Sequence, residues 1–334
     1  MAFITKWGSM WGSIPARQGR VIFVAPAASY AVDGRTYSAS DDNQGFAPEN
    51  AKRTINSAMD QCAANRGDTI VLLDGGTHTV TATQTLDIAG VTVLGVHGYY
   101  GQDNGQPPVA LSIDGTADEL LDIRASNVEV GHLRLVGEGA TSTVSFQTAN
   151  SLDNLRLHDL FIDMRYNDAI TRDSRGIDFA NRRGGTGTTR MGTSISGVAT
   201  AYLENITFWS NGANGEALLM ATCTIRAKNL VFHNDAGTWA TPVAVATSVD
   251  NSFMDACVWT SSGTMTLCVA GPQANYAVDA ADSLYITNSR FTRNTATFAT
   301  VFDGFGTQAI SLGIADCRVM GGHGQANVQV TTTT

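Results

Sequence analysis

Apolar and polar positions along the chain follow an eight-residue pattern that recurs at intervals. Its first and third positions are apolar, its fourth and fifth are turn-forming, and its sixth and eighth are again small or apolar. Positions one and three alternate as in a half-buried β-strand, and the step to position six breaks that alternation. Each copy therefore predicts two short strands joined by a corner. The seven copies span residues 128–135, 155–162, 201–208, 225–232, 252–259, 284–291 and 312–319.

The fifth position of each copy is the point where the chain must bend. Asn and Asp, which dominate there, tolerate the left-handed backbone conformation of such a bend. The spacing between successive corners is 27, 46, 24, 27, 32 and 28 residues, and the interval of 46 has room for a further repeat. The corner residues are His132, Asp159, Asn205, Asn229, Ala256, Asn288 and Asp316.

Corners repeated at this interval predict an all-β solenoid, a parallel β-helix. Each strand would pair with its equivalent in the next rung at about 4.8 Å. An antiparallel sandwich is the alternative, because its strands are also short and closely spaced, but it does not require the same corner seven times in register. In the solenoid, the eighth positions form an internal apolar stack: Leu135, Ile162, Phe208, Phe232, Trp259, Phe291 and Val319.

The first rung of a solenoid exposes an open core and an unpaired strand edge, so it needs a cap. Residues 51–64 place Ile55, Ala58, Met59 and Cys62 on one face of a predicted helix. Pro48 precedes this segment as a first-turn residue, and a glycine at 67 ends it. We expect a capping helix over 51–64.

Residues 38–55, the predicted helix and the following Gly-Asp-Thr-Ile-Val-Leu-Leu together resemble the start of a known family. They are similar to right-handed parallel β-helix proteins of the pectate-lyase-like superfamily, and with the repeats the likeness covers about residues 21–325. That superfamily includes polysaccharide lyases, glycoside hydrolases, bacteriophage tailspikes and other virion proteins. Residues 24–45 are most similar to short phage-encoded β-helix proteins. The resemblance implies a right-handed coil and a place in a virion.

Four segments follow from this organisation. Residues 1–20 form an N-terminal anchoring arm, in which Trp7 and Trp11 either dock onto a partner or fold back over the capping helix. Residues 21–66 hold the leading segment and the capping helix, and residues 67–325 form the parallel β-helix. Residues 326–334 are a C-terminal tail that could add a last strand or pair between chains of a trimer.

Composition excludes several classes of partner. The formal charge of −9 and the pI near 5.0 argue against nucleic acid, which requires a basic surface. No apolar run approaches the roughly 18 residues of a membrane span, and the N-terminus lacks a signal-peptide pattern. The five cysteines are scattered without metal-ligand spacing and are expected to be small buried residues.

Charge is concentrated in residues 153–183, which hold six Asp and six Arg. Equal numbers favour mutual pairing, at a contact between subunits or with a partner, over a metal site, which would be net acidic. An anionic-sugar site and a solvated face are the alternatives. The predicted interface residues, with the two tryptophans of the arm, are Trp7, Trp11, Asp163, Arg165, Asp168, Arg172, Asp173, Arg175, Arg182 and Arg183.

Catalytic motifs are largely missing from the sequence. β-Helix enzymes that cleave polygalacturonate carry a paired Asp shortly before Gly-His-Gly, and here Gly322-His323-Gly324 has no such pair before it. Glycoside hydrolysis needs two carboxylates facing across the bond. We therefore predict no catalytic, cofactor-binding or metal-binding residue, and we expect His78, His132, His158 and the other histidines to have turn or surface roles.

These observations predict a bacteriophage virion structural protein without catalytic activity, made in the host bacterial cytoplasm. It would be a homotrimeric capsid decoration or surface spike protein that contacts the major capsid protein or other virion proteins. The first alternative is a polysaccharide lyase or glycoside hydrolase acting on an acidic glycan. The second is a non-catalytic adhesin that binds a host surface glycan.

Overall fold

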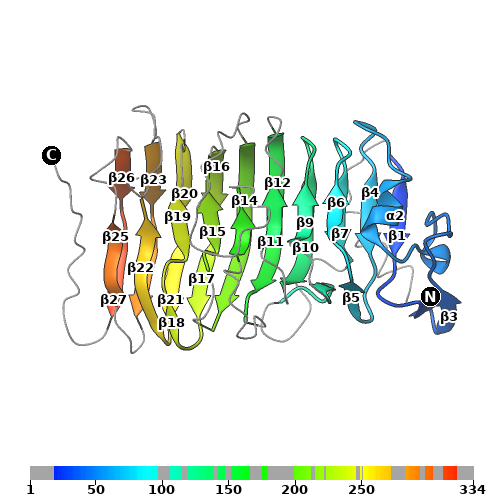
Figure 1. Ribbon diagram of the computed structural model, residues 1–334, viewed down its shortest axis with the longest axis horizontal. Helices are drawn as coiled ribbons and strands as arrows, with labels where there is room; N and C mark the ends of the chain where they lie inside the picture. The colour runs from blue at the N-terminus through cyan, green and yellow to red at the C-terminus, as the bar shows by residue number, and fades with distance from the viewer. Residues whose placement is uncertain are drawn as a thin grey trace.

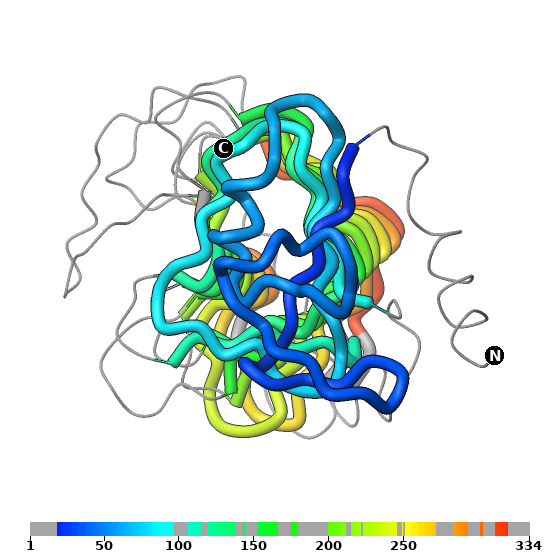
Figure 2. Tube along the Cα trace, turned by 90° about the vertical axis from the view of Figure 1, so that its right-hand side faces the viewer, coloured from blue at the N-terminus to red at the C-terminus, as the bar shows by residue number. Residues whose placement is uncertain are grey.

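A computed structural model of the chain shows an elongated β-structure. It describes residues 19–96, 106–114, 119–137, 142–146, 152–165, 175–179, 199–211, 215–221, 223–245, 249, 251–271, 283–293, 298–303 and 311–321. The strands lie side by side along the long axis of the molecule, with β1 near one end and β26 and β27 at the other (Figure 1). Viewed from the end, the chain winds in a coil around a central core (Figure 2).

Most strands belong to two long parallel sheets, and β2 (Ser29–Val32) and β3 (Arg35–Ser38) form a separate antiparallel hairpin. The central path of the first sheet, in order, is β1 (Val21–Val24), β4 (Thr69–Leu72), β7 (Thr92–Gly95), β10 (Glu129–Val136), β12 (Leu152–Asp163), β14 (Ala199–Ser210), β16 (Cys223–Lys228), β20 (Ser252–Asp255), β23 (Ser283–Thr287) and β26 (Ser311–Ala315). Its branches are β5 (Thr77–Val80), β8 (Ala110–Ile113), β17 (Val231–Asn234), β21 (Val258–Ser261), β24 (Arg290–Arg293) and β27 (Arg318–Gly321).

The second sheet alternates with the first along the chain. Its strands, in chain order, are β6 (Gln84–Leu86), β9 (Glu119–Ile123), β11 (Ser142–Phe146), β13 (Arg175–Asp178), β15 (Leu218–Met220), β18 (Thr238–Trp239), β19 (Val243–Val245), β22 (Thr264–Ala270) and β25 (Phe298–Asp303). Each strand pairs in parallel with strands of the neighbouring rungs, as in β9–β11–β13–β15. This topology is a right-handed parallel β-helix, the hand that parallel crossovers almost always take. The predicted fold class is confirmed, and the sandwich alternative is wrong.

The internal apolar stack also forms as predicted. Register pairs its seven members in sequence, from Leu135 with Ile162 to Phe291 with Val319. In the middle of the stack the rings of Phe208 and Phe232 lie 5.2 Å apart and 1° from parallel. Trp259 follows, with centroids 4.9 Å from Phe232 and 4.5 Å from Phe291. Aromatic rings repeated at the rung spacing therefore form a continuous stack in the core.

The 46-residue interval does not contain a further rung of the first sheet. β12 pairs directly with β14, from Leu155 opposite Ala201 to Asp163 opposite Trp209. A single turn of the coil therefore separates β12 from β14, and it contributes β13 to the second sheet.

The predicted helix over 51–64 is much shorter in the structure. The α-helix α2 spans Ile55–Met59, and the 3-10 turn η1 spans Pro48–Asn50. The apolar face is as expected, since Ile55, Ala58 and Met59 are buried and α2 contacts β1, β4 and β6. The helix stops early because Asp68 binds the segment that follows, accepting hydrogen bonds from the Ala63 amide and the Arg66 side chain. Its role as a cap stays a prediction.

The cysteines pack in or against the core, but Cys62 and Cys317 are only partly buried, whereas all five were expected to be buried. All five are free thiols, and Cys223, Cys257 and Cys268 are buried. Burial raises the pKa of the Cys257 thiol to about 12, and it raises the pKa of Cys62 to a similar value. These thiols are therefore protonated and unreactive at neutral pH.

Candidate functional site

The corners of the coil form a column of left-handed residues on the outside of the first sheet. All seven predicted corner positions have φ between 50° and 58°, including Ala256, which has neither an amide nor a carboxylate. Three of the polar members bond to one another from rung to rung. Asn229 Nδ2 donates to Asn205 Oδ1 at 3.0 Å, and Asn205 Nδ2 donates to Asp159 Oδ1 at 3.0 Å. The column thus ends, toward the N-terminus, at an ionisable pair.

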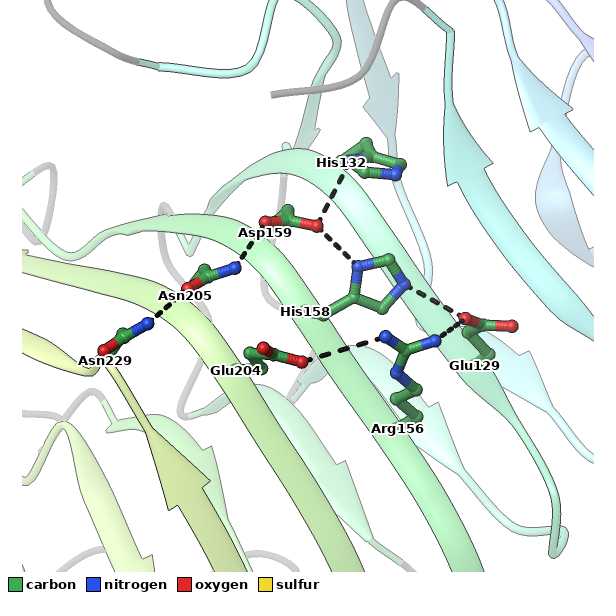
Figure 3. A network of polar contacts seen from close by, with 8 residues as sticks. All are labelled: Glu129, His132, Arg156, His158, Asp159, Glu204, Asn205 and Asn229. Carbon is green, nitrogen blue, oxygen red and sulfur yellow. Dashed lines mark hydrogen bonds and ion pairs between the residues drawn. The ribbon is translucent and has the colours of Figure 1, made fainter. Parts of the chain in front are cut away.

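That pair belongs to a network of ionisable side chains on β10, β12 and β14 (Figure 3). The ring of His158 lies between two carboxylates, with Nδ1 2.7 Å from Asp159 Oδ2 and Nε2 3.1 Å from Glu129 Oε1. Arg156 donates to the same Glu129 oxygen at 2.9 Å and lies 3.8 Å from Glu204. The ring of His132, in the preceding rung, meets the His158 ring edge to face at 5.0 Å.

Register explains why residues 26 or 27 positions apart meet here. β10 and β12 pair with Glu129 opposite Arg156 and Gly131 opposite His158. The next residue on each strand is the corner residue, so His132 and Asp159 point outward side by side. A side chain at position 131 would displace the His158 ring, because a Cβ atom there would lie 2.5 Å from His158 Cε1.

The network sets the charge states of its members. Burial opposes the charged form of His158, but hydrogen bonds to Asp159 and Glu129 outweigh it and raise the pKa of the ring. Burial would also raise the pKa of Asp159, yet the bonds from His158 and Asn205 hold it below its usual range. For His132, burial lowers the pKa, and the nearby His158 lowers it further. The network therefore favours the cationic form of His158 and the neutral form of His132.

Among the described residues, one group of histidines and carboxylates has the arrangement of a metal-ligand set. His132, His158 and Asp159 each offer one ligand atom, and these three atoms lie within 4.8 Å of one another. The side chains of His132 and Asp159 are each 22% exposed, whereas that of His158 is nearly buried. The group therefore lies near the surface, although His132 Nδ1 itself is buried.

A strip of exposed rings continues along the same sheet face. Register aligns Tyr202, Arg226, Phe253 and Tyr285 in consecutive rungs, and we call these four residues the aromatic strip. The three aromatic side chains are 37–46% exposed. Phe253 and Tyr285 stack at 5.2 Å, and the Arg226 guanidinium lies 5.6 Å from the Phe253 ring centre.

An open groove of about 550 Å³ runs beside the strip. Both acidic and basic side chains line it, together with three members of the strip. Hydrogen bonds from Asn288 and Thr287 hold the pKa of one of them, Asp255, below its usual range. The lining residues are Tyr202, Leu203, Glu204, Arg226, Ala227, Lys228, Phe253 and Asp255.

Most of the described members of the charged segment 153–183 form ion pairs within the chain. Asp163 is fully buried, and its carboxylate contacts Arg134 at 2.6 Å and Arg165 at 2.8 Å. Arg175 is almost completely buried between Asp178 and Glu216. That these residues also contact another subunit or a partner protein stays a prediction. The remaining predicted interface residues lie outside the described part of the chain: Trp7, Trp11, Asp168, Arg172, Asp173, Arg182 and Arg183.

Neither the histidine network nor the aromatic strip was among the features predicted from the sequence. The signal for both was present, because aligning the eight-residue copies places His132 beside Asp159 and Arg226 beside Phe253. No single copy of the eight-residue pattern contains either cluster, and only alignment of neighbouring copies brings the residues together. No helix in the described residues is long and apolar enough to cross a membrane.

No protein-family model and no curated protein matches this chain. Among solved structures, the chain is similar to the pectin methyl esterase of the rice weevil, with a TM-score of 0.46 and 12% sequence identity. That match covers 84% of this chain and 90% of the other. At this level the likeness carries no argument about activity, and the fold assignment rests on the strand pairing described above.

Proposed function

We propose that this chain is a structural protein of a bacteriophage virion, a homotrimeric capsid decoration or surface spike protein without catalytic activity. The observation that carries the proposal is the continuous ladder of parallel strands from β1 to β26, whose buried charges are neutralised within the chain. Such a ladder suits a passive, mechanically stable rod. The likeness of residues 24–45 to short phage β-helix proteins supports the virion setting.

The experiment is to follow the protein through a density gradient of particles from its source culture with a specific antibody. Many copies banding with intact virions would support capsid decoration, and few copies would favour a tail-associated spike. Protein found only in the soluble fraction would overturn the proposal. A chain lacking residues 1–20 tests the arm that carries Trp7 and Trp11, since we expect it to remain folded but not to join particles.

Glycan binding is the second candidate, and the aromatic strip is the observation that favours it. Exposed rings at regular spacing, flanked by groups that donate and accept hydrogen bonds, suit the apolar faces and hydroxyls of a sugar chain lying along the rod. In this form the protein would be a surface spike that adheres to a host polysaccharide. Catalysis is less well supported, because a glycosidase acid needs a raised pKa and that of Asp255 is lowered.

Titration with polysaccharides from candidate hosts tests this second function. Replacing Tyr202, Phe253 and Tyr285 with alanine together should weaken binding at least 10-fold while leaving the fold intact. Phe46→Ala is the matched control, since Phe46 is 44% exposed but lies outside the strip. Equal binding by the triple variant and the wild type would exclude the strip, and cleavage of the polysaccharide would support the enzymatic alternative.

A further inference from the structure

The three side chains of His132, His158 and Asp159, which we call the histidine–aspartate cluster, have distances that need a physical explanation. His132 Nδ1 lies 3.6 Å from Asp159 Oδ2. That separation exceeds a hydrogen bond, and His132 Nδ1 is a buried atom without a hydrogen-bond partner in the described part of the chain. Leaving a buried ring nitrogen unbonded is unfavourable.

The distance of 3.6 Å between His132 Nδ1 and Asp159 Oδ2 is close to the distance between two ligand atoms of one metal ion. Zinc binds imidazole nitrogen at about 2.0–2.1 Å and carboxylate oxygen at about 2.0–2.2 Å. Two such ligands at the tetrahedral angle are roughly 3.4 Å apart. A small movement of His132 and Asp159 would therefore place both atoms on one ion. The 2.7 Å contact from His158 Nδ1 to Asp159 Oδ2 is a hydrogen bond, and a bound ion would replace its proton.

The residues that hydrogen-bond to the cluster have the arrangement found around metal-binding histidines. Metal-bound histidines usually donate their second ring N–H to a carboxylate, which fixes the ring and its tautomer. Here His158 Nε2 faces Glu129 Oε1 at 3.1 Å. Arg156 and Thr92 in turn bond to Glu129, at 2.9 Å and 3.2 Å.

Asp159 is oriented in a similar way, because its other oxygen accepts the Asn205 amide at 3.0 Å. The left-handed corners at His132 and Asp159, with φ of 58° and 52°, direct both side chains outward from adjacent rungs. Four-coordinate zinc with three protein ligands keeps one position open. The partial exposure of the cluster leaves that position to water or to a group from a partner.

We infer that the histidine–aspartate cluster binds one divalent transition-metal ion of the zinc class through His132 Nδ1, His158 Nδ1 and the Asp159 carboxylate. Two nitrogen ligands out of three select zinc, nickel or copper over calcium and magnesium, which prefer oxygen. The ion ties the corners of two consecutive rungs together. It also presents a Lewis-acidic open position on the side of the rod.

Calorimetric titration of the chelator-treated full chain with zinc chloride tests the inference. We expect one zinc ion per chain and a melting temperature that rises with zinc concentration, whereas calcium should have neither effect. Cobalt should give the visible absorption of a four-coordinate nitrogen and oxygen site. Absence of zinc binding by the wild-type chain overturns the inference.

Variants separate this cluster from incidental binding at other histidines. His132→Gln removes a ligand that makes no hydrogen bond among the described residues, so the metal-free variant should remain folded and bind zinc at least 10-fold more weakly than the wild type. Glu129→Gln, which alters the group behind His158, should weaken zinc binding about 10- to 100-fold. His233→Gln is the matched control, since its half-buried ring lies outside the cluster beside Asp235. Wild-type affinity in H132Q, or an equal loss in H233Q, would refute the assignment.

Discussion

The imidazole ring of His158 packs directly on the backbone of Gly131 in the preceding rung. A Cβ atom at Gly131 would lie 2.5 Å from His158 Cε1 and 2.6 Å from its Nε2. The position of the ring between Glu129 and Asp159 therefore depends on the missing side chain at 131 as much as on the two carboxylates.

Gly131→Ala should displace the His158 ring and lower the free energy of unfolding by about 1–3 kcal/mol, because the added methyl group overlaps the ring. Chemical denaturation provides the measurement. Gly76→Ala is the control, since the nearest atom to its new Cβ is Pro26 Cβ at 3.5 Å and little change is expected. Combining G131A with His158→Ala should cost less than the sum of the two single changes. Strict additivity would show that the ring does not mediate the effect.

Ala256→Gly should stabilise the protein by about 1 kcal/mol, because alanine at φ 52° is strained and glycine is not. Thermal and urea unfolding would show the gain. Ala315→Gly supplies a control of opposite sign, since residue 315 lies within β26 and glycine there should cost about 0.5–1 kcal/mol. Destabilisation by A256G would mean that the corner conformation carries no strain.

Trp259→Ala should lower the free energy of unfolding by about 3–5 kcal/mol, since it opens a cavity in the middle of the internal stack. Trp259→Phe should cost less than about 1.5 kcal/mol. The phenyl ring keeps the stacking and removes an indole N–H that is buried without a hydrogen-bond partner among the described residues. Equal losses in the two variants, measured by denaturation, would contradict a role for ring stacking.

Acid should destabilise the protein through His78, whose side chain is buried in β5 with Nε2 2.7 Å from the Leu73 carbonyl oxygen. Burial lowers the pKa of this ring from 6.5 to about 4 in the folded chain. The unfolded chain therefore binds a proton that the folded chain does not, between pH 6.5 and 4. Stability from this residue is fully present above pH 6.5, and about 3 kcal/mol is lost as the pH falls to 4.

His78→Leu removes this titration, so the stability difference between wild type and variant should shift in favour of the variant as the pH falls. Urea unfolding of both proteins at pH 7.5, 6, 5 and 4 measures that difference directly. Other acid-sensitive groups affect both proteins equally and cancel. A difference that stays constant with pH would show that His78 is not the source.

The corner conformation could be predicted from sequence because it depends on local chemistry repeated in register. Even Ala256, which lacks the usual side chain, was placed correctly by its spacing from Asn229 and Asn288. The helix over 51–64 was predicted too long because Asp68, beyond the segment, competes for its backbone. The histidine cluster joins residues from different rungs, so no single stretch of sequence indicates it. Charge counting in 153–183 likewise could not distinguish an exposed surface from pairs such as Asp163 with Arg134.

Because equivalent corners occur in consecutive rungs, the number of rungs can change without altering the structure of each rung. β17 matches β21 residue for residue, with Val231 opposite Val258, and the end of β16 matches β20 at the same offset, with Arg226 opposite Phe253. If one such 27-residue unit were duplicated or lost, each strand and each corner would still meet its equivalent in the neighbouring rung. Evolution can therefore lengthen or shorten this molecule in whole steps while the remaining rungs, and any site built between two of them, stay unchanged.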